Sequence, residues 1–166
     1  SFVDGASGVV LDDTYKEYYF TFNNIHPATD DSKLLVNFRD GGTDYDATKT
    51  TTFFRAQHSE GGANGNLSYR TDDDLAQSTA AQPLTMDIGN ANDESASGEM
   101  ILYNPSSTTF VKHFIANANC VYSGDYSMQS FVAGYCNVTA AIDAVQFTME
   151  GGTNIDSGDI CLYGIL

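Results

Sequence analysis

Short apolar segments in which large side chains recur at every second position dominate this chain. In YKEYYFTFNN (residues 15–24), Tyr18, Phe20 and Phe22 fall on one side of an extended backbone. The segment LLVNFRD (residues 34–40) alternates in the same way. Because successive side chains of a strand point to opposite faces, this pattern predicts half-buried β-strands.

The whole chain is predicted to fold as a single all-β domain over residues 1–166. Turn-forming Gly, Asn, Asp and Ser separate the apolar segments, and helical periodicity is scarce. We interpret TDDDLAQ (residues 71–77) as a polar loop, with a single helical turn as the alternative. Such a pattern favours a two-sheet antiparallel β-sandwich of jelly-roll-like form. The predicted strands cover residues 18–23, 34–40, 50–57, 84–88, 99–104, 109–116, 128–137, 141–149 and 158–166.

The last two predicted strands are expected to form a hairpin. They flank EGGTNIDSG (residues 150–158), a segment rich in turn formers. Val145, Phe147 and Met149 share one face and should belong to the core. The closing stretch DICLYGIL is apolar to its final residue, so we predict a buried core strand there, held by Tyr163 and Ile165.

Two loops stand out in the sequence. The glycines of DGGTD (residues 40–44) suit a sharp reversal that needs positive φ. Residues 58–82 hold few large apolar side chains, and we expect this stretch to lie outside the core.

The charge balance argues against two classes of partner. Lys and Arg total 7 against 22 Asp and Glu, which gives a formal net charge of −15. Such a surface repels phosphate backbones and anionic lipid headgroups. No run of about 18 apolar residues occurs, so no membrane-spanning segment is predicted either.

No catalytic or cofactor motif is found. His26, His58 and His113 are isolated, and no nucleophile elbow or Lys-containing phosphate loop occurs. Cys120, Cys136 and Cys161 lie in apolar stretches, where a free cysteine behaves as a small hydrophobic residue. We therefore predict no catalytic or cofactor-binding residue and expect a protein that is not an enzyme.

Acidic loop residues leave Ca²⁺ as a candidate ligand. Asp40, Asp44 and Asp46 offer oxygen atoms in one loop, and residues 72–74 and 92–94 offer them in two others. None of these groups has the twelve-residue spacing of an EF-hand, so we interpret them as solvated acids and assign no metal ligand.

Tyrosines in turn-rich segments are the remaining candidates for partner contacts. Tyr45, Tyr69, Tyr122 and Tyr126 are placed where a ring can stack on a sugar or fill a pocket of another protein. A structural role at the ends of the sheets is the alternative for the same residues.

Three segments resemble a family of phage virion structural proteins, of the tail-fibre, tail-associated or capsid-decoration type. They are NNIHPATDDSKLLVNFRDGGTDYDA (23–47), SGEMILYNPSS (97–107) and AIDAVQFTMEGGTNIDSGDICLYGIL (141–166). The resemblance spans most of the chain in order. It implies a β-sandwich mounted on a virion, often as a trimer, beside other virion proteins. These are turn and strand motifs, which identify an architecture and assign no catalytic residue.

The preferred hypothesis is a non-enzymatic bacteriophage virion protein, a knob displayed on a tail fibre or capsid at the particle surface. Its loops would contact a host surface glycan or protein, or neighbouring virion proteins. The alternative is a carbohydrate-binding module of a secreted bacterial protein, which would use the loop tyrosines. A hydrolase with paired carboxylates is a third hypothesis, supported by no motif.

Overall fold

The computed structural model describes all 166 residues and contains eleven β-strands, one short 3₁₀ turn and no α-helix. The strands run, in chain order, over Phe2–Val3 (β1), Glu17–Pro27 (β2), Leu34–Arg39 (β3), Lys49–Ser59 (β4), Asn66–Tyr69 (β5), Gln82–Pro83 (β6), Ala96–Tyr103 (β7), Lys112–Tyr122 (β8), Tyr126–Cys136 (β9), Ala144–Met149 (β10) and Ile155–Ile165 (β11).

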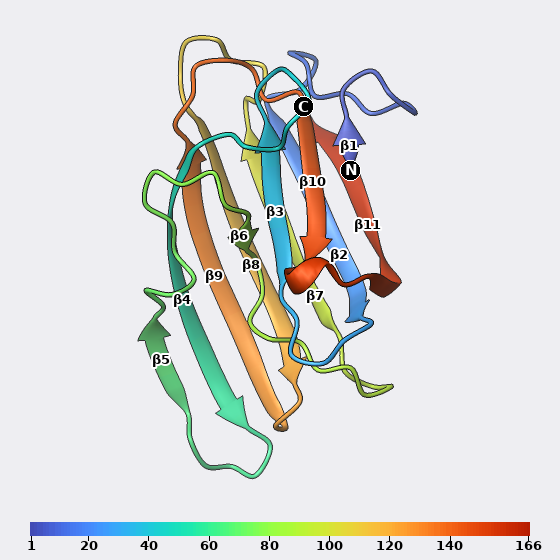
Figure 1. Cartoon of the computed structure of the whole chain (residues 1–166), viewed down its shortest axis with the longest axis vertical. Coiled ribbons are helices and arrows are strands. Elements are labelled where there is room, and N and C mark those ends of the chain that lie inside the picture. The colour runs from blue at the N-terminus through green and yellow to red at the C-terminus, as the bar shows by residue number, and fades with distance from the viewer.

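The strands form two antiparallel sheets that face each other. One has four strands in the order β1-β10-β3-β6, and the other has seven in the order β11-β2-β7-β8-β9-β4-β5. In Figure 1 the four-stranded sheet lies in front of the seven-stranded sheet. The prediction of an all-β sandwich is therefore confirmed.

Strand pairing is nested, with early strands meeting late ones. β2 pairs with β11, β3 with β10, β4 with β9 and β7 with β8. This nesting is the pairing of a rolled-up long hairpin, as in a jelly roll. Of these four pairs, only β3·β10 lies in the smaller sheet, and the other three lie in the larger one. The two layers are therefore unequal, and much of the larger sheet extends past the smaller one.

Aromatic side chains from both sheets form the centre of the core. Phe20 and Phe22 of β2 meet Phe147 of β10 edge to face, with ring centroids 5.3 and 5.2 Å apart. Phe38 of β3 meets Phe114 of β8 at 5.1 Å. Each such contact is worth about 0.5–1.5 kcal/mol beyond the apolar area it buries. The predicted inward set of β2 thus holds the two layers together.

The predicted terminal hairpin is wrong. β10 pairs with β3 in the smaller sheet, whereas β11 pairs with β2 in the larger one. The 3₁₀ turn Glu150–Gly152 carries the chain between the layers, and Gly151 takes a positive φ of 69° there. The turn-rich loop does reverse the chain. However, β10 and β11 belong to different sheets and contribute side chains to the same core from opposite sides.

The prediction of a buried final strand is also wrong. β11 is the edge strand of the larger sheet, Tyr163 and Ile165 are 51% and 43% exposed, and Leu166 is fully exposed. Its contribution to the core comes from half-buried side chains alone, those of Ile155, Ile160 and Leu162. The terminus is ordered by its ladder with β2 and by the N-terminal segment, not by burial in the sandwich.

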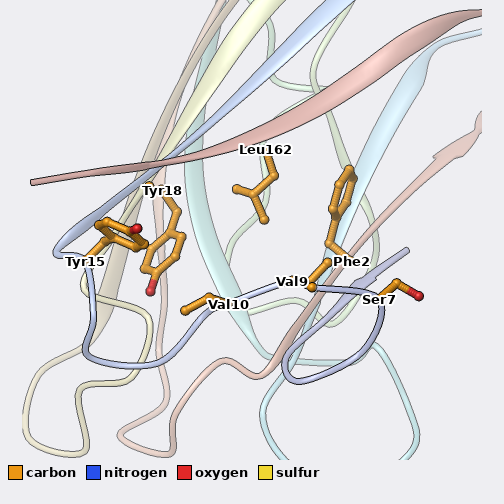
Figure 2. Close-up of a pocket in the computed structure, with 9 residues that line it drawn as sticks. Phe2, Ser7, Val9, Val10, Tyr15, Tyr18 and Leu162 are labelled. Atoms are coloured by element: carbon orange, nitrogen blue, oxygen red, sulfur yellow. The ribbon is translucent and has the colours of Figure 1, made fainter.

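The N-terminal segment covers the inner side of β11 around a hollow of about 370 Å³. Figure 2 shows Leu162 directed toward this hollow, with Phe2 and Val9 on one side and Tyr15 on the other. The Tyr15 ring lies so close to Gly164 that a Cβ there would come within 2.2 Å of it. Position 164 therefore requires glycine.

Residues 84–88, of which only Asp87 is not fully buried, do not form the predicted strand. The adjacent β6 is only two residues long, and the chain beyond it is held by single contacts. Leu84 N donates to Leu34 O at 2.8 Å, and Leu34 N donates to Thr85 Oγ1 at 2.9 Å. The Thr85 hydroxyl oxygen takes the place of the backbone carbonyl that would continue the β3·β6 pairing. The strand therefore ends there, although the segment that follows remains buried.

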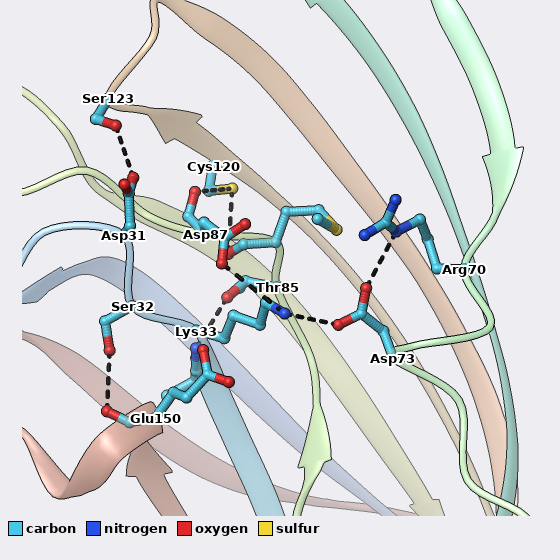
Figure 3. A network of polar contacts seen from close by, with 12 residues as sticks. Asp31, Ser32, Lys33, Arg70, Asp73, Thr85, Asp87, Cys120, Ser123 and Glu150 are labelled. Atoms are coloured by element: carbon cyan, nitrogen blue, oxygen red, sulfur yellow. Dashed lines mark hydrogen bonds and ion pairs between the residues drawn. The ribbon is translucent and has the colours of Figure 1, made fainter.

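A polar network attaches the stretch between β5 and β7 to the sandwich (Figure 3). The Asp73 side chain is 1% exposed and accepts from Lys33 Nζ at 2.7 Å and from Arg70 Nε at 3.1 Å. Burial opposes the charge of Lys33, but the hydrogen bond to Asp73 and the nearby charge of Asp87 raise its pKa. Residues 58–82 were expected outside the core, and Asp73 with Gln82 corrects that expectation.

Candidate functional site

The seven-stranded sheet has an outer face that no other element covers. We use this name for the side chains of its strands that point away from the four-stranded sheet, on the side turned from the viewer in Figure 1. Along β8, Phe114 is buried while Ile115 is 51% exposed. Six of the eight exposed large hydrophobic residues of the chain lie on this face: Phe54, Leu67, Tyr69, Ile115, Tyr163 and Ile165.

The strand register places an aromatic row across this face. Tyr69 of β5, Phe54 of β4, Phe131 of β9, Asn117 of β8 and Glu99 of β7 are direct neighbours on successive strands. The Phe54 and Phe131 rings are stacked, with centroids 4.8 Å apart and planes 12° from parallel. The row thus passes from aromatic to polar over five strands.

Three hollows follow β4, β8 and β9 along the outer face. The central one, of about 410 Å³, lies between Phe131, Asn117 and Ile115. A second, of about 390 Å³, lies toward His113 and Tyr135, and a smaller one, of about 190 Å³, toward the other end of the strands. Ala133 of β9 lines both of the larger hollows.

The outer face is almost uncharged on a strongly acidic molecule. Among the outward positions of β4, β7, β8 and β9, Glu99 alone carries a charge at neutral pH, although the chain has a formal net charge of −15. The Tyr19 hydroxyl donates to the Glu99 carboxylate, and this bond raises the pKa of Tyr19. Glu99 is therefore held in place at the polar end of the aromatic row.

Amides on the face are oriented by bonds to each other. Gln129 Nε2 donates to Asn117 Oδ1 at 2.9 Å, and Asn119 Nδ2 donates to Ser127 Oγ at 2.9 Å. These contacts leave the Asn117 amide nitrogen and the Gln129 carbonyl oxygen without a partner in the protein. The face therefore presents a fixed donor and a fixed acceptor beside the aromatic row.

Of the four predicted contact tyrosines, the structure brings Tyr122 and Tyr126 together. They face each other across the β8–β9 turn with ring centroids 6.2 Å apart. Both are half-buried and pack against the core. Asn64, in the loop after β4, donates to the Tyr126 hydroxyl at 3.5 Å. This pair closes one end of the sandwich.

The other two tyrosines lie elsewhere. Tyr69 belongs to the edge of the outer face, and its hydroxyl donates to Asp74 Oδ2 at 2.6 Å, which raises the pKa of Tyr69. Tyr45 lies in the loop after β3, where the Arg39 guanidinium is 5.9 Å from the centre of its ring. The four residues therefore form no common site.

Acidic residues of the loops 72–74 and 92–94 make internal contacts. Asp73 pairs with two cations, as described above, and Glu94 accepts from the backbone N–H of Ala91 at 2.7 Å. No group of three or more His, Cys, Asp or Glu side chains is placed to hold a metal ion.

A cluster of reactive groups lies inside the molecule, at the end of β4, β8 and β9. Lys49, Cys136 and Lys112 are paired across the three strands and are fully buried. Burial lowers the pKa of Lys49 to about 8 and raises the pKa of Cys136 to about 12. Lys49 Nζ donates to Ala47 O at 2.8 Å, so its hydrogen-bonding needs are met internally. The three side chains are closed off from solvent.

The predicted contact residues omit most of the outer face. Phe54, Phe131 and Tyr135 lie in the predicted strands 50–57 and 128–137 and are not among the four tyrosines predicted to contact a partner. A signal was present in the alternating pattern of both segments. In 50–57 each of the two alternate sets contains a phenylalanine, and in 128–137 one set contains Phe131 and Tyr135 while the other contains Met128, Val132 and Cys136. A strand with one solvated face should be polar on that face.

Comparison with protein-family models and with curated proteins gives no match. Among solved structures, one similar chain is a structural-genomics protein of unknown function from Bacteroides ovatus, with 6% identity and a TM-score of 0.34. The match covers 62% of this chain and 45% of that protein. The aligned part is thus under half of that protein's length, and so weak a likeness carries no functional argument. The structure contains no helix that is long and apolar enough to span a membrane.

Proposed function

We propose that this chain is a non-enzymatic bacteriophage virion protein, displayed on the particle surface as part of a tail fibre or as a head decoration. Its role would be attachment to the host surface, assembly of the virion, or both. The three segments that resemble phage virion proteins support this proposal. They supply β3, β7, β10 and β11, and so include strands of both sheets.

The shared turn motifs lie where the backbone requires them. Gly41 and Gly42, in the crossing from β3 to β4, have φ values of 96° and 104°. Gly158 has a φ of 111°, and a Cβ there would come within 2.5 Å of Asn24 O. Because other residues adopt these conformations only with strain, the resemblance concerns residues that determine the fold.

The outer face is the observation that carries the attachment role. Monomeric soluble proteins rarely leave large contiguous apolar patches open, and such patches mark sites of interaction. Here the exposed aromatic and aliphatic residues gather on one face of one sheet. Display in several copies, as a trimer, would multiply a weak contact by avidity.

A virion role predicts that the protein travels with intact particles. Antibodies raised against the purified chain should label gradient-purified phage at the tail or capsid in electron micrographs. Light scattering of the pure protein at micromolar concentration should report a mass near three chains. Peptides found only in the unassembled fraction of the lysate would contradict the proposal.

Attachment predicts competition with the phage. Host cells incubated with excess purified protein should adsorb phage more slowly than untreated cells. Phe131→Ala, on the outer face, should lose this effect. The matched control Phe110→Ala changes an aromatic residue that is 70% exposed in a loop outside the face, and it should compete like the wild type.

The alternative, a carbohydrate-binding module of a secreted bacterial protein, is favoured by the aromatic row beside fixed amides. It predicts that the chain is found in culture supernatants of bacteria that carry no phage, and that antibodies leave purified virions unlabelled.

A further inference from the structure

We propose that the outer face of the seven-stranded sheet is a binding groove for an uncharged polysaccharide chain, with Phe131 as its stacking surface. This inference rests on the proposed attachment function and names the partner of that function. It moves the binding site from the loop tyrosines to the middle of β4, β8 and β9.

The shape of the face suits a linear ligand. The three hollows follow the direction of the strands, from the level of Ser127 to that of Tyr135 on β9. At about 3.4 Å per residue this path is about 27 Å long. Ala133 lies between the two larger hollows and lines both, so its small side chain keeps the path continuous.

Aromatic rings stand along this path. Phe54 stacks on Phe131, and both rings line the central hollow together with Asn117. Further along, the rings of His113 and Tyr135 lie 6.0 Å apart beside the second hollow. Flat apolar surfaces of this kind suit the C–H faces of sugar rings, and the stack holds Phe131 in place before a ligand arrives.

Polar groups beside the rings match the hydroxyls of a sugar. The free amide nitrogen of Asn117 can donate, and the free carbonyl oxygen of Gln129 can accept, while a hydrogen bond between the two side chains fixes both. Glu99, held by Tyr19, is a further acceptor at the edge of the central hollow. A small number of placed polar groups in a largely apolar hollow is typical of small-ligand sites.

The negative charge of the protein favours an uncharged ligand in the groove. The formal net charge of −15 repels sulfated or uronic-acid chains. The outward positions of β4, β7, β8 and β9 contain no Lys or Arg that could pair with an anion. A neutral chain escapes this repulsion and brings no ionic group of its own into the groove when water is excluded.

The test is calorimetric titration of the protein with neutral dextran, galactomannan and xylan, with chondroitin sulfate as the anionic comparison. We expect saturable binding to at least one neutral polysaccharide and none to chondroitin sulfate. Phe131→Ala and Asn117→Ala should each weaken that binding at least tenfold. Phe110→Ala should bind like the wild type, and circular dichroism should show the wild-type fold for all three variants.

Several results would contradict the proposal that the outer face binds a polysaccharide. Equal binding by wild type and both outer-face variants would place the site elsewhere. A dimer that dissociates on Phe131→Ala would make the face a contact between copies. If no neutral polysaccharide binds but the protein still slows phage adsorption through Phe131, the attachment function stands and its partner is a protein. If adsorption is also unaffected, the attachment function fails as well.

Discussion

The two faces of the seven-stranded sheet are built from the same strands and from similar residues, yet they have different surroundings. On β4, Phe53 is fully buried and its neighbour Phe54 is 40% exposed. On β8, Phe114 is buried against Phe38 of the other sheet, and Ile115 is open. The inner face meets a second layer, whereas the outer face meets none.

This difference separates two uses of apolar side chains. Inside, they stabilise the fold, because their surface leaves water when the sheets close. Outside, they add little to stability and are available for a partner. Substitutions on the inner face should therefore lower the free energy of unfolding, whereas substitutions on the outer face should mainly weaken binding. Four experiments test which parts of the molecule contribute to stability.

The largest effect is expected for the adjacent pair Phe53 and Phe54. Phe53→Ala removes a fully buried ring and should lower the free energy of unfolding by about 3–5 kcal/mol. Phe54→Ala loses mainly the stack on Phe131 and should cost about 1 kcal/mol. Urea denaturation of both variants measures the contrast. Equal losses would mean that the outer face is part of the stabilising core.

The network that closes the inner side gives the next effect. Asp73→Ala leaves Lys33 and Arg70 without their shared carboxylate and should cost about 3 kcal/mol. Asp72→Ala removes an exposed neighbouring carboxylate and should stay within about 0.5 kcal/mol of wild type. Chemical denaturation reports both values. A loss for Asp73→Ala no larger than that for Asp72→Ala would show that the buried pairs contribute nothing.

The edge of the sheet is tested by Gly164→Ala. The new Cβ would collide with the Tyr15 ring and should cost about 1–3 kcal/mol as the N-terminal segment moves away from β11. Gly61→Ala, where a Cβ meets no neighbour within 4 Å, is the matched control. Thermal melting should show a lower Tm for Gly164→Ala alone. Similar Tm values for both variants would argue that Tyr15 does not hold the edge.

A smaller, pH-dependent effect is expected from Lys49. Its pKa in the folded protein is about 8, below the ordinary 10.5, so the unfolded chain binds more protons between these values. The free energy of unfolding contributed by Lys49 should therefore rise from pH 8 to pH 10.5 and stay constant below pH 8. In Lys49→Met this rise is absent, and denaturation at several pH values gives the difference. Parallel curves for the two proteins would contradict the buried-charge account.

Local alternation predicted the inner face well. Tyr18, Phe20 and Phe22 are buried as expected, and Phe147 meets two of them across the core. The period of two depends only on neighbouring residues along one strand, so it can be read without knowledge of the fold. Eight of the nine predicted strands overlap observed ones for this reason.

Long-range partners could not be read in the same way. The turn between β10 and β11 suits a hairpin as well as a crossing between sheets, and only the pairing of β11 with β2 decides between them. Burial of Asp73 depends on Lys33, forty residues earlier in the chain. The candidate site was missed because exposed aromatics in a strand resemble core residues until the position of the second sheet is known.

The distribution of charge has a consequence for the attachment to a host cell that we propose. An anionic cell surface repels this acidic protein. At low ionic strength this repulsion opposes contact between the cell and the nearly uncharged outer face. Added salt shortens the range of that repulsion to about 8–10 Å at 0.1–0.15 M. Adsorption to host cells should therefore be faster at high salt than at low salt. A protein with a net positive charge would show the opposite dependence.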